Sequence, residues 1–491
     1  MFFSEFSNVL RELVDRFNPP GLGPGILKVY FGFTPIVLLT TANTAEALFM
    51  DNINLKRPMG YHFLKRWLGD SILILCGEKW RLKRKAIVYA FHSKKMMEGY
   101  LVNINGYSAR FVDFIGRRIQ ENPKEVRLIR EISRCTLDIM AATSLGSDLN
   151  CINGDNYFGT NLAQFQLLVL ARHLRPWMWW DFVYYNFTSE GKMEKRCIKN
   201  MSNLSNNVLQ QHKAKLCIKK NKPVPTNGTT NGVKACPVEE RSKPKFKTFL
   251  DVYLNYFSKN LVSEMDVRNE TDGILFAGQD TTSTAVSFTL YLLGLYPEHQ
   301  ERCRQEVFYV VGDNNPMTPI TTDHLKEFEY LNACLLEAMR LFPPVPLIGR
   351  HLTKDVTVKG GNATINTCYK IPAGVQVFTS IFHLHRDPLY FPEPDKFWPE
   401  RFLNQDSPHR QNPFAYVPFA AGPRNCAGSK YATMTSKVIL AHMLRNFTFR
   451  STRPIERLKL CFGIVTRSKG DLRVQIRPLH YPPNIYKGQH H

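Results

Sequence analysis

Cys426 stands in a glycine-rich segment, Phe419-Ala420-Ala421-Gly422-Pro423-Arg424-Asn425-Cys426-Ala427-Gly428. The flanking glycines allow the backbone to turn sharply and to approach a flat ligand closely. Arg424 can offer paired, charge-assisted hydrogen bonds to a carboxylate. A thiolate in such a loop can be the axial ligand of a haem iron, where it favours cleavage of an O–O bond. A lone Cys-x-Gly is more often a buried structural cysteine, so only the full spacing indicates a cofactor loop.

An acid and an alcohol, Asp280 and Thr281, interrupt the strongly apolar segment 273–293. Such a pair can relay protons from solvent to a reacting oxygen. In a membrane span Asp280 would cost about 2.5–3.5 kcal/mol, so the segment is predicted to be a buried core helix. Gly278 costs such a helix about 1 kcal/mol relative to alanine, which indicates close approach of another group. The alternative is a kink in which the hydroxyls bond back to helix carbonyls; Cys426, which follows 146 residues later (426 − 280), favours proton delivery.

Two charged residues, Glu337 and Arg340, lie three positions apart in a segment that Pro343 ends. This spacing places them on one helical face. Most such pairs are exposed and contribute little to stability. The apolar neighbours of this pair predict that it is buried, with Arg401 as a third partner.

Trp80 and Arg84 lie four positions apart, so both can donate to one carboxylate from the same helical face. Arg350, after Pro346, is a further candidate for this role. The alternative for residues 80–85 is a basic surface helix.

The surrounding elements are mostly helical. Helical patterns cover about 90–215, 248–342 and 427–445, and short β-like runs occur at 26–31 and 36–39. We therefore expect a mainly α fold with small β-sheets, formed by one domain over 19–480. The breaker-rich stretch 219–247 is predicted to be a flexible surface loop, and 481–491 a tail.

The N-terminal segment 1–18 is amphipathic, because residues 2–17 have one apolar and one polar helical face. Two interpretations remain open: a helix in a membrane interface and an ordinary helix packed on the domain. The aromatic segment 177–185 also has two interpretations. Its Trp and Tyr side chains suit core packing, and they equally suit a membrane interface or a substrate channel.

The overall charge is basic, with a formal net charge of +22. This favours an anionic membrane face or an acidic redox protein, whereas no nucleic-acid motif is present. The 11 cysteines include no C-x-x-C pair, which argues against zinc clusters, short-spaced iron–sulfur clusters and a secreted disulfide framework. No run of 18 uncharged apolar residues predicts a spanning helix.

The Cys426 loop resembles the haem-binding loop of the cytochrome P-450 superfamily, and the segments 63–74, 80–84, 90–92, 180–185 and 248–252 resemble its family 4. The resemblance implies the P-450 haem-domain fold, with Cys426 on the iron of haem b inside a loop that includes Phe419, Arg424 and Gly428. It also implies propionate contacts from Trp80, Arg84 and Arg350, proton delivery by Asp280 and Thr281, and a structural triad of Glu337, Arg340 and Arg401.

The same resemblance implies an apolar, lipid-like substrate such as a fatty acid. It further implies O2, electrons from an NADPH-cytochrome reductase, and a place on the cytoplasmic face of the endoplasmic reticulum membrane. Two departures stand out. Ala277 replaces a glutamate that can form an ester to haem in many family-4 members, so covalent attachment there is excluded, and Gln279 replaces a usual histidine. The expected hydrophobic anchor is also missing before Pro19.

Three functions are consistent with these residues. The first is a monooxygenase. The second is a reductase-independent haem-thiolate isomerase or dehydratase, against which the Asp280-Thr281 pair argues. The third is a non-catalytic haem sensor.

Overall fold

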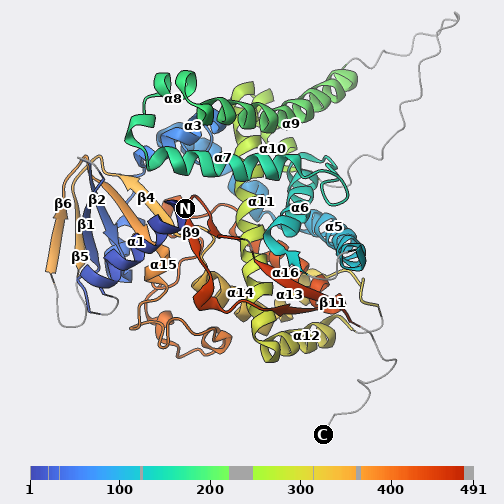
Figure 1. The fold of residues 1–491 in the computed structure, drawn as a ribbon. Helices are drawn as coiled ribbons and strands as arrows, with labels where there is room; N and C mark the ends of the chain where they lie inside the picture. Colours follow the sequence, from blue (N-terminus) through green and yellow to red (C-terminus); the bar gives the residue numbers. More distant parts are fainter. Residues whose placement is uncertain are drawn as a thin grey trace, which may run out of the picture.

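Helices make up most of the chain in the computed structural model, which describes residues 2–19, 22–31, 34–121, 125–220, 247–312, 315–360, 367–470 and 472–479 (Figure 1). The α-helices are α1 (Phe2–Phe17), α2 (Ala42–Phe49), α3 (His62–Leu68), α4 (Gly77–His92), α5 (Lys94–Glu121), α6 (Leu128–Met140), α7 (Tyr157–His173), α8 (Asp181–Phe187), α9 (Ser189–Lys220), α10 (Phe249–Ser258), α11 (Glu264–Leu295), α12 (Pro297–Val311), α13 (Thr322–Glu327), α14 (Glu329–Leu341), α15 (Ile381–Leu384) and α16 (Ser429–Asn446). Short helical turns are η1 (Met59–Tyr61), the π-helical η2 (Ala141–Leu145), η3 (Pro176–Met178), η4 (Pro399–Phe402), η5 (Pro408–Gln411), η6 (Gly422–Arg424) and η7 (Ile455–Arg457).

The strands form small sheets, and the strands β1, β2, β4, β5 and β6 lie beside the helical body, at the left of Figure 1. They are β1 (Ile26–Phe31), β2 (Thr34–Leu39), β3 (Val126–Arg127), β4 (Leu347–His351), β5 (Val356–Gly360), β6 (Thr367–Ile371), β7 (Gln376–Ser380), β8 (Phe447–Ser451), β9 (Leu460–Phe462), β10 (Thr466–Ser468) and β11 (Arg473–Pro478). The largest sheet has the order β1-β2-β7-β4, in which only the β2–β7 pair is parallel. The others are β3-β11-β8, β9-β10 and β5-β6. The prediction of a mainly α fold with small sheets is confirmed.

Helix α11 runs through the middle of the molecule (Figure 1). Ser263 caps its first turn together with Asp266, which satisfies backbone donors that the helix start leaves free. The helix packs against α6, α14 and α16, so it is buried along most of its length. The predicted close approach at Gly278 is also present, because a Cβ there would lie 2.4 Å from the Met140 sulfur.

Helix α1 buries part of its apolar face inside the domain. Leu10 and Val14 are buried in the main core, and the Ser7 hydroxyl accepts a hydrogen bond from the Phe462 backbone N–H of β9 at 2.6 Å. Leu10 and Val14 thus support the interpretation of residues 2–17 as a helix packed on the domain, whereas Val9 and Phe17, on the same apolar face, are 50% and 57% exposed. An amphipathic pattern arises equally from either kind of apolar contact. Among the helices of the described ranges, none has the length and apolarity to cross a membrane.

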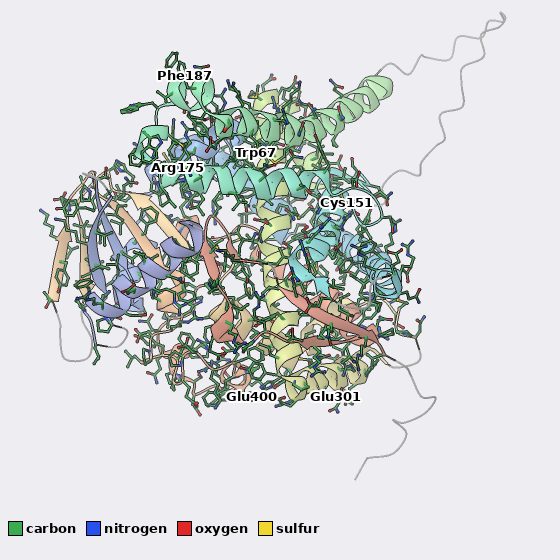
Figure 2. All side chains as sticks on the ribbon, in the orientation of Figure 1. Trp67, Cys151, Arg175, Phe187, Glu301 and Glu400 are labelled. Carbon is green, nitrogen blue, oxygen red and sulfur yellow. The ribbon has the colours of Figure 1, made fainter. Side chains whose placement is uncertain are left out.

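The segment between α7 and α9 exposes large aromatic side chains. Phe187, at the end of α8, stands at the outer edge of the molecule (Figure 2).

The predicted loop 219–247 lies outside the described residues apart from 219–220 and 247, and the predicted tail 481–491 lies entirely outside them.

Candidate active site

A mostly apolar cavity lies between α4, α11 and the Cys426 loop. The site residues predicted from the sequence that line it are Trp80, Arg84, Thr281, Phe419, Arg424, Cys426 and Gly428. Its apolar wall includes Leu64, Ile72, Ile87, Phe91, Ile274, Phe276, Met339 and Val465. Two predicted residues, Asp280 and Arg350, do not line it.

The Cys426 loop has the tight geometry that its glycines predict. The Cys426 N–H donates to the Phe419 carbonyl at 2.9 Å. Gly422 has φ +68°, and a Cβ there would lie 1.8 Å from the Phe49 carbonyl oxygen. A Cβ at Gly428 would meet open space, and since Gly428 lines the cavity, its small size leaves room for a flat group.

The Cys426 thiol lies where a thiolate can be stabilised. Helix α16 begins at Ser429, and a helix N-terminus favours a nearby negative charge. Burial raises the pKa of the thiol, whereas the Gly428 N–H and Arg84 act in the opposite direction. No other described cysteine lines this cavity.

Helix α4 holds the loop from one side. The Arg84 guanidinium donates to the Asn425 carbonyl at 2.9 Å and to the Asn425 side chain. His92, which the sequence analysis missed, lies with its Nε2 3.0 Å from the Ala427 carbonyl oxygen. Trp80 is buried, and its indole N–H has no acceptor among the described residues. This donor is therefore available to a group in the cavity.

A buried ion cluster fixes α4 against α11. The Lys83 ammonium lies 2.9 Å from Asp266 and 3.1 Å from Glu270. Glu270 also accepts from the Ile72 backbone N–H at 2.8 Å, which ties the cavity wall at Ile72 to α11. Burial raises the pKa of Glu270 to about 7, against the effect of Lys83.

Arg424 is engaged with the backbone in this structure. Its guanidinium donates to the carbonyls of Leu55 at 2.9 Å, Ile72 at 3.0 Å and Leu75, and it lies 4.5 Å from the centre of the Trp80 ring. Burial, with Arg57 and Arg350, lowers its pKa to about 8. The sequence predicts that the paired N–H donors of Arg424 contact a carboxylate. In the structure these donors contact mainly loop carbonyls, and the sequence could not reveal these partners.

Arg57, Arg84, Arg350 and Arg424 form a cationic cluster beside the cavity. Arg57 lines the cavity and was missed because no motif marks it. Arg350 is fully buried outside the lining, with its pKa lowered to about 9 by burial and Arg57. Among the described residues, none of the four forms an ion pair. Because buried charges are costly without a counter-charge, the cluster fits a group with carboxylates, such as a haem with its propionates.

Asp280 and Thr281 point to different sides of α11. Thr281 lines the cavity, and its hydroxyl donates to the Ala277 carbonyl at 2.7 Å. Asp280 accepts from Gln166 of α7 at 2.5 Å and from Arg467 of β10. Adjacent helical residues diverge by about 100°, so Thr281 faces the cavity while Asp280 faces Gln166 and Arg467. Gln166 and Arg467 carry no local sequence signal.

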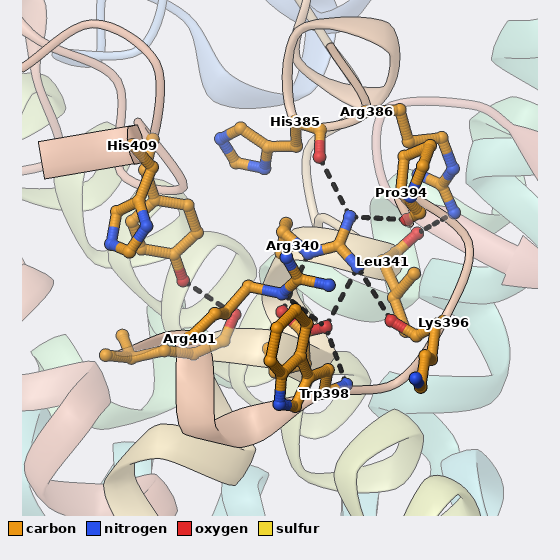
Figure 3. Close-up of polar contacts among 12 residues, drawn as sticks. Arg340, Leu341, His385, Arg386, Pro394, Lys396, Trp398, Arg401 and His409 are labelled. Atoms are coloured by element: carbon orange, nitrogen blue, oxygen red, sulfur yellow. Dashed lines mark hydrogen bonds and ion pairs between the residues drawn. The ribbon is translucent and has the colours of Figure 1, made fainter. Parts of the chain in front are cut away.

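A polar network away from the cavity joins Glu337, Arg340 and Arg401. Figure 3 shows the two arginines of this network. Arg340 donates to Glu337 at 2.7 Å and 2.9 Å, and Arg401 donates to it at 3.2 Å. Arg340 also reaches the carbonyls of His385, Pro394 and Lys396. All three predicted partners are buried. The cluster therefore joins α14 to the chain that leads toward the Cys426 loop.

The family follows from this geometry together with sequence comparison. A family model described as Cytochrome P450 matches residues 14–472. The chain belongs to the cytochrome P450 family, and it is a haem-thiolate monooxygenase that uses O2 and a redox partner.

Individual relatives belong to family 4. The chain is 34% identical to mouse Cytochrome P450 4V2 over 458 residues, which cover 93% of this chain and 82% of the relative. It is 32% identical to Drosophila melanogaster Cytochrome P450 4c3 over 457 residues, with 92% and 82% covered. It is 32% identical to rat Cytochrome P450 4F6 over 453 residues, with 91% and 79% covered.

Proposed function

We propose that this chain hydroxylates a fatty acid or a similar apolar lipid, with electrons from an NADPH-cytochrome reductase on the cytoplasmic face of the endoplasmic reticulum membrane. The proposal rests on one observation. Cys426 and Thr281 line the same cavity, and the rest of its wall is mainly aliphatic and aromatic. A lipid chain gains free energy by leaving water for such a wall.

The chain offers a binding set for haem b. Cys426 would bind the haem iron through its thiolate, and Phe419, Gly422 and Gly428 would shape the loop around it. Trp80, Arg57, Arg84 and Arg424 line the cavity and supply donors and positive charge for the propionates, while Arg350 adds charge from outside the lining. When bound, a thiolate-ligated haem supplies the oxygen chemistry by which one atom of O2 enters the substrate and the other leaves as water.

The remaining residues orient the substrate and move protons. Ile72, Ile87, Phe276 and Val465 exclude water from the substrate chain. Thr281, which lines the cavity, would pass a proton into it through its hydroxyl, with Asp280 as the acid next to it in the chain. Arg467 is partly exposed, so the Asp280–Arg467 pair connects the acid with the protein surface.

The test is product formation from a panel of fatty acids and apolar lipids, with and without reductase and NADPH. Hydroxylated products that require both additions would support the proposal. Rearranged peroxide substrates formed without reductase would instead assign an isomerase or dehydratase. Haem reduction without product from any lipid in the panel would contradict the proposal and favour a sensor.

A further inference from the structure

His92 is the last residue of α4, and its Nε2 is turned toward the Cys426 loop. A histidine in the last turn of a helix can bond the free carbonyls of its own helix. Here Nε2 lies 3.0 Å from the carbonyl oxygen of Ala427, which is 335 residues away in the chain. A carbonyl oxygen can only accept a hydrogen bond, so Nε2 carries the ring proton and donates. The contact is therefore a long-range hydrogen bond from α4 to the loop.

Packing of the neighbouring residue holds this end of α4 in place. Phe91 is buried, and its ring meets the Tyr431 ring of α16 in an edge-on contact, with the centroids 5.3 Å apart. The Tyr431 hydroxyl in turn lies 2.8 Å from the Thr143 hydroxyl. Helix α16 begins directly after the Cys426 loop. The end of α4 is thus fixed against the helix that follows the loop.

The Ala427 carbonyl and the Gly428 N–H belong to one peptide group. A trans peptide group is planar, so its C=O and its N–H point in opposite directions. The carbonyl accepts from His92, and the N–H donates to the Cys426 thiol, whose pKa it lowers. A donor lowers the pKa of a thiol because it stabilises the thiolate. A single peptide group therefore connects His92 with the thiolate.

The contact of Arg84 with the loop acts on a different peptide group. Arg84 donates to the Asn425 carbonyl at 2.9 Å. The N–H of that peptide group belongs to Cys426, and it donates to the Phe419 carbonyl at 2.9 Å. Of these two contacts between α4 and the loop, only that of His92 leads to the sulfur.

We propose that His92 is a positioning residue that strengthens the hydrogen bond from the Gly428 N–H to the Cys426 thiolate and so raises the reduction potential of the haem. Hydrogen bonds in a chain polarise one another, so a donor at the carbonyl makes the N–H of the same peptide group a stronger donor. A stronger donor withdraws electron density from the sulfur, which makes the iron easier to reduce. The proposal rests on Cys426 as the iron ligand of the proposed function and identifies a residue that tunes this ligand.

The test is a redox titration of three haem-loaded proteins: wild type, His92→Phe and His92→Gln. His92→Phe keeps a flat ring and removes the donor, so the ratio of ferrous to ferric protein at a fixed potential should fall about twofold. A change of this size is expected when a charge-assisted hydrogen bond loses a cooperative contribution of roughly 10–30%. His92→Gln keeps an N–H donor and should recover most of the wild-type ratio.

Resonance Raman spectra of the ferric proteins measure the iron–sulfur bond directly. A thiolate with a weaker hydrogen bond binds iron more strongly, so the Fe–S stretching band of His92→Phe should move to higher frequency. A loss of packing alone would lower the haem content and leave this band in place. His324→Phe makes the same change on α13, whose residues do not line the cavity. This control should keep the wild-type ratio and the wild-type band.

The proposal is overturned if His92→Phe keeps either the wild-type ratio or the wild-type band. It is also overturned if His92→Gln shifts both as far as His92→Phe does. The reduced wild-type protein with carbon monoxide tests the ligand assignment separately. If it lacks the red-shifted Soret band of a thiolate ligand, Cys426 does not hold the iron and the ligand assignment fails together with the role of His92. If the band is present, the His92 variants alone decide that role.

Discussion

Asp272 on α11 provides a quantitative test of the buried environment around this helix. Its side chain is fully buried, and the Ser205 hydroxyl donates to it at 2.6 Å. Burial raises its pKa from 3.8 to about 7, against the effects of Ser205 and Arg268. The native state therefore binds this proton more tightly than the unfolded state does. Stability should fall as pH rises from about 4 to about 7 and should change little above that, with a total loss of about 4 kcal/mol from this group.

Asp272→Asn removes the titration and keeps an oxygen that can accept from Ser205. The difference in unfolding free energy between the variant and wild type should shift in favour of the variant by about 3 kcal/mol between pH 5 and pH 8. Denaturant unfolding of the haem-loaded protein, followed by circular dichroism at several pH values, measures this difference. The contributions of all other titrating groups are the same in both proteins, so they cancel in the difference between the two unfolding free energies.

Asp113→Asn makes the same chemical change at an exposed position of α5 and serves as the control. If the pH profiles of wild type and Asp272→Asn run parallel, the carboxyl of Asp272 does not titrate between the two states. The reasoning from burial would then be refuted.

Four further outcomes are expected. Cys426→Ala should abolish the red-shifted Soret band of the reduced protein with carbon monoxide; a retained band would assign the iron to another ligand. Thr281→Ala should keep its haem but release peroxide in place of product, with a loss in product formation of about 10²–10⁴-fold, and unchanged coupling would exclude the proton role. Glu337→Ala strands Arg340 and Arg401, a loss of about 3–5 kcal/mol, so little haem-loaded protein should accumulate; normal haem content would show that the network is dispensable. Gly422→Ala should also lower haem loading, because its Cβ would overlap the Phe49 carbonyl, whereas Gly106→Ala, with open space around its Cβ, should not.

Local spacing was sufficient to predict several features of this molecule. The central helix, the tight Cys426 loop and the Glu337–Arg340 contact each depend on residues close together in the chain. Such features follow from helical periodicity and from the conformational freedom of glycine.

Long-range partners could not be predicted in the same way. Gln166 and Arg467 reach Asp280 from 114 and 187 residues away, and Arg57 joins the cationic cluster without any motif. The face of residues 2–17 was ambiguous for a different reason. Burial of Val14 in a core and insertion of Val14 into a membrane satisfy the same apolar pattern, and only the packing of α1 near β9 distinguishes them.

Ala277 has a practical consequence for cofactor chemistry. It lines the cavity, and its backbone carbonyl accepts a hydrogen bond from the Thr281 hydroxyl. A methyl side chain cannot form an ester, so at this position the prosthetic group depends on reversible bonds alone. The porphyrin should therefore be extractable under mild acid and replaceable by a manganese or cobalt analogue, which would make this chain a host for artificial metalloporphyrins.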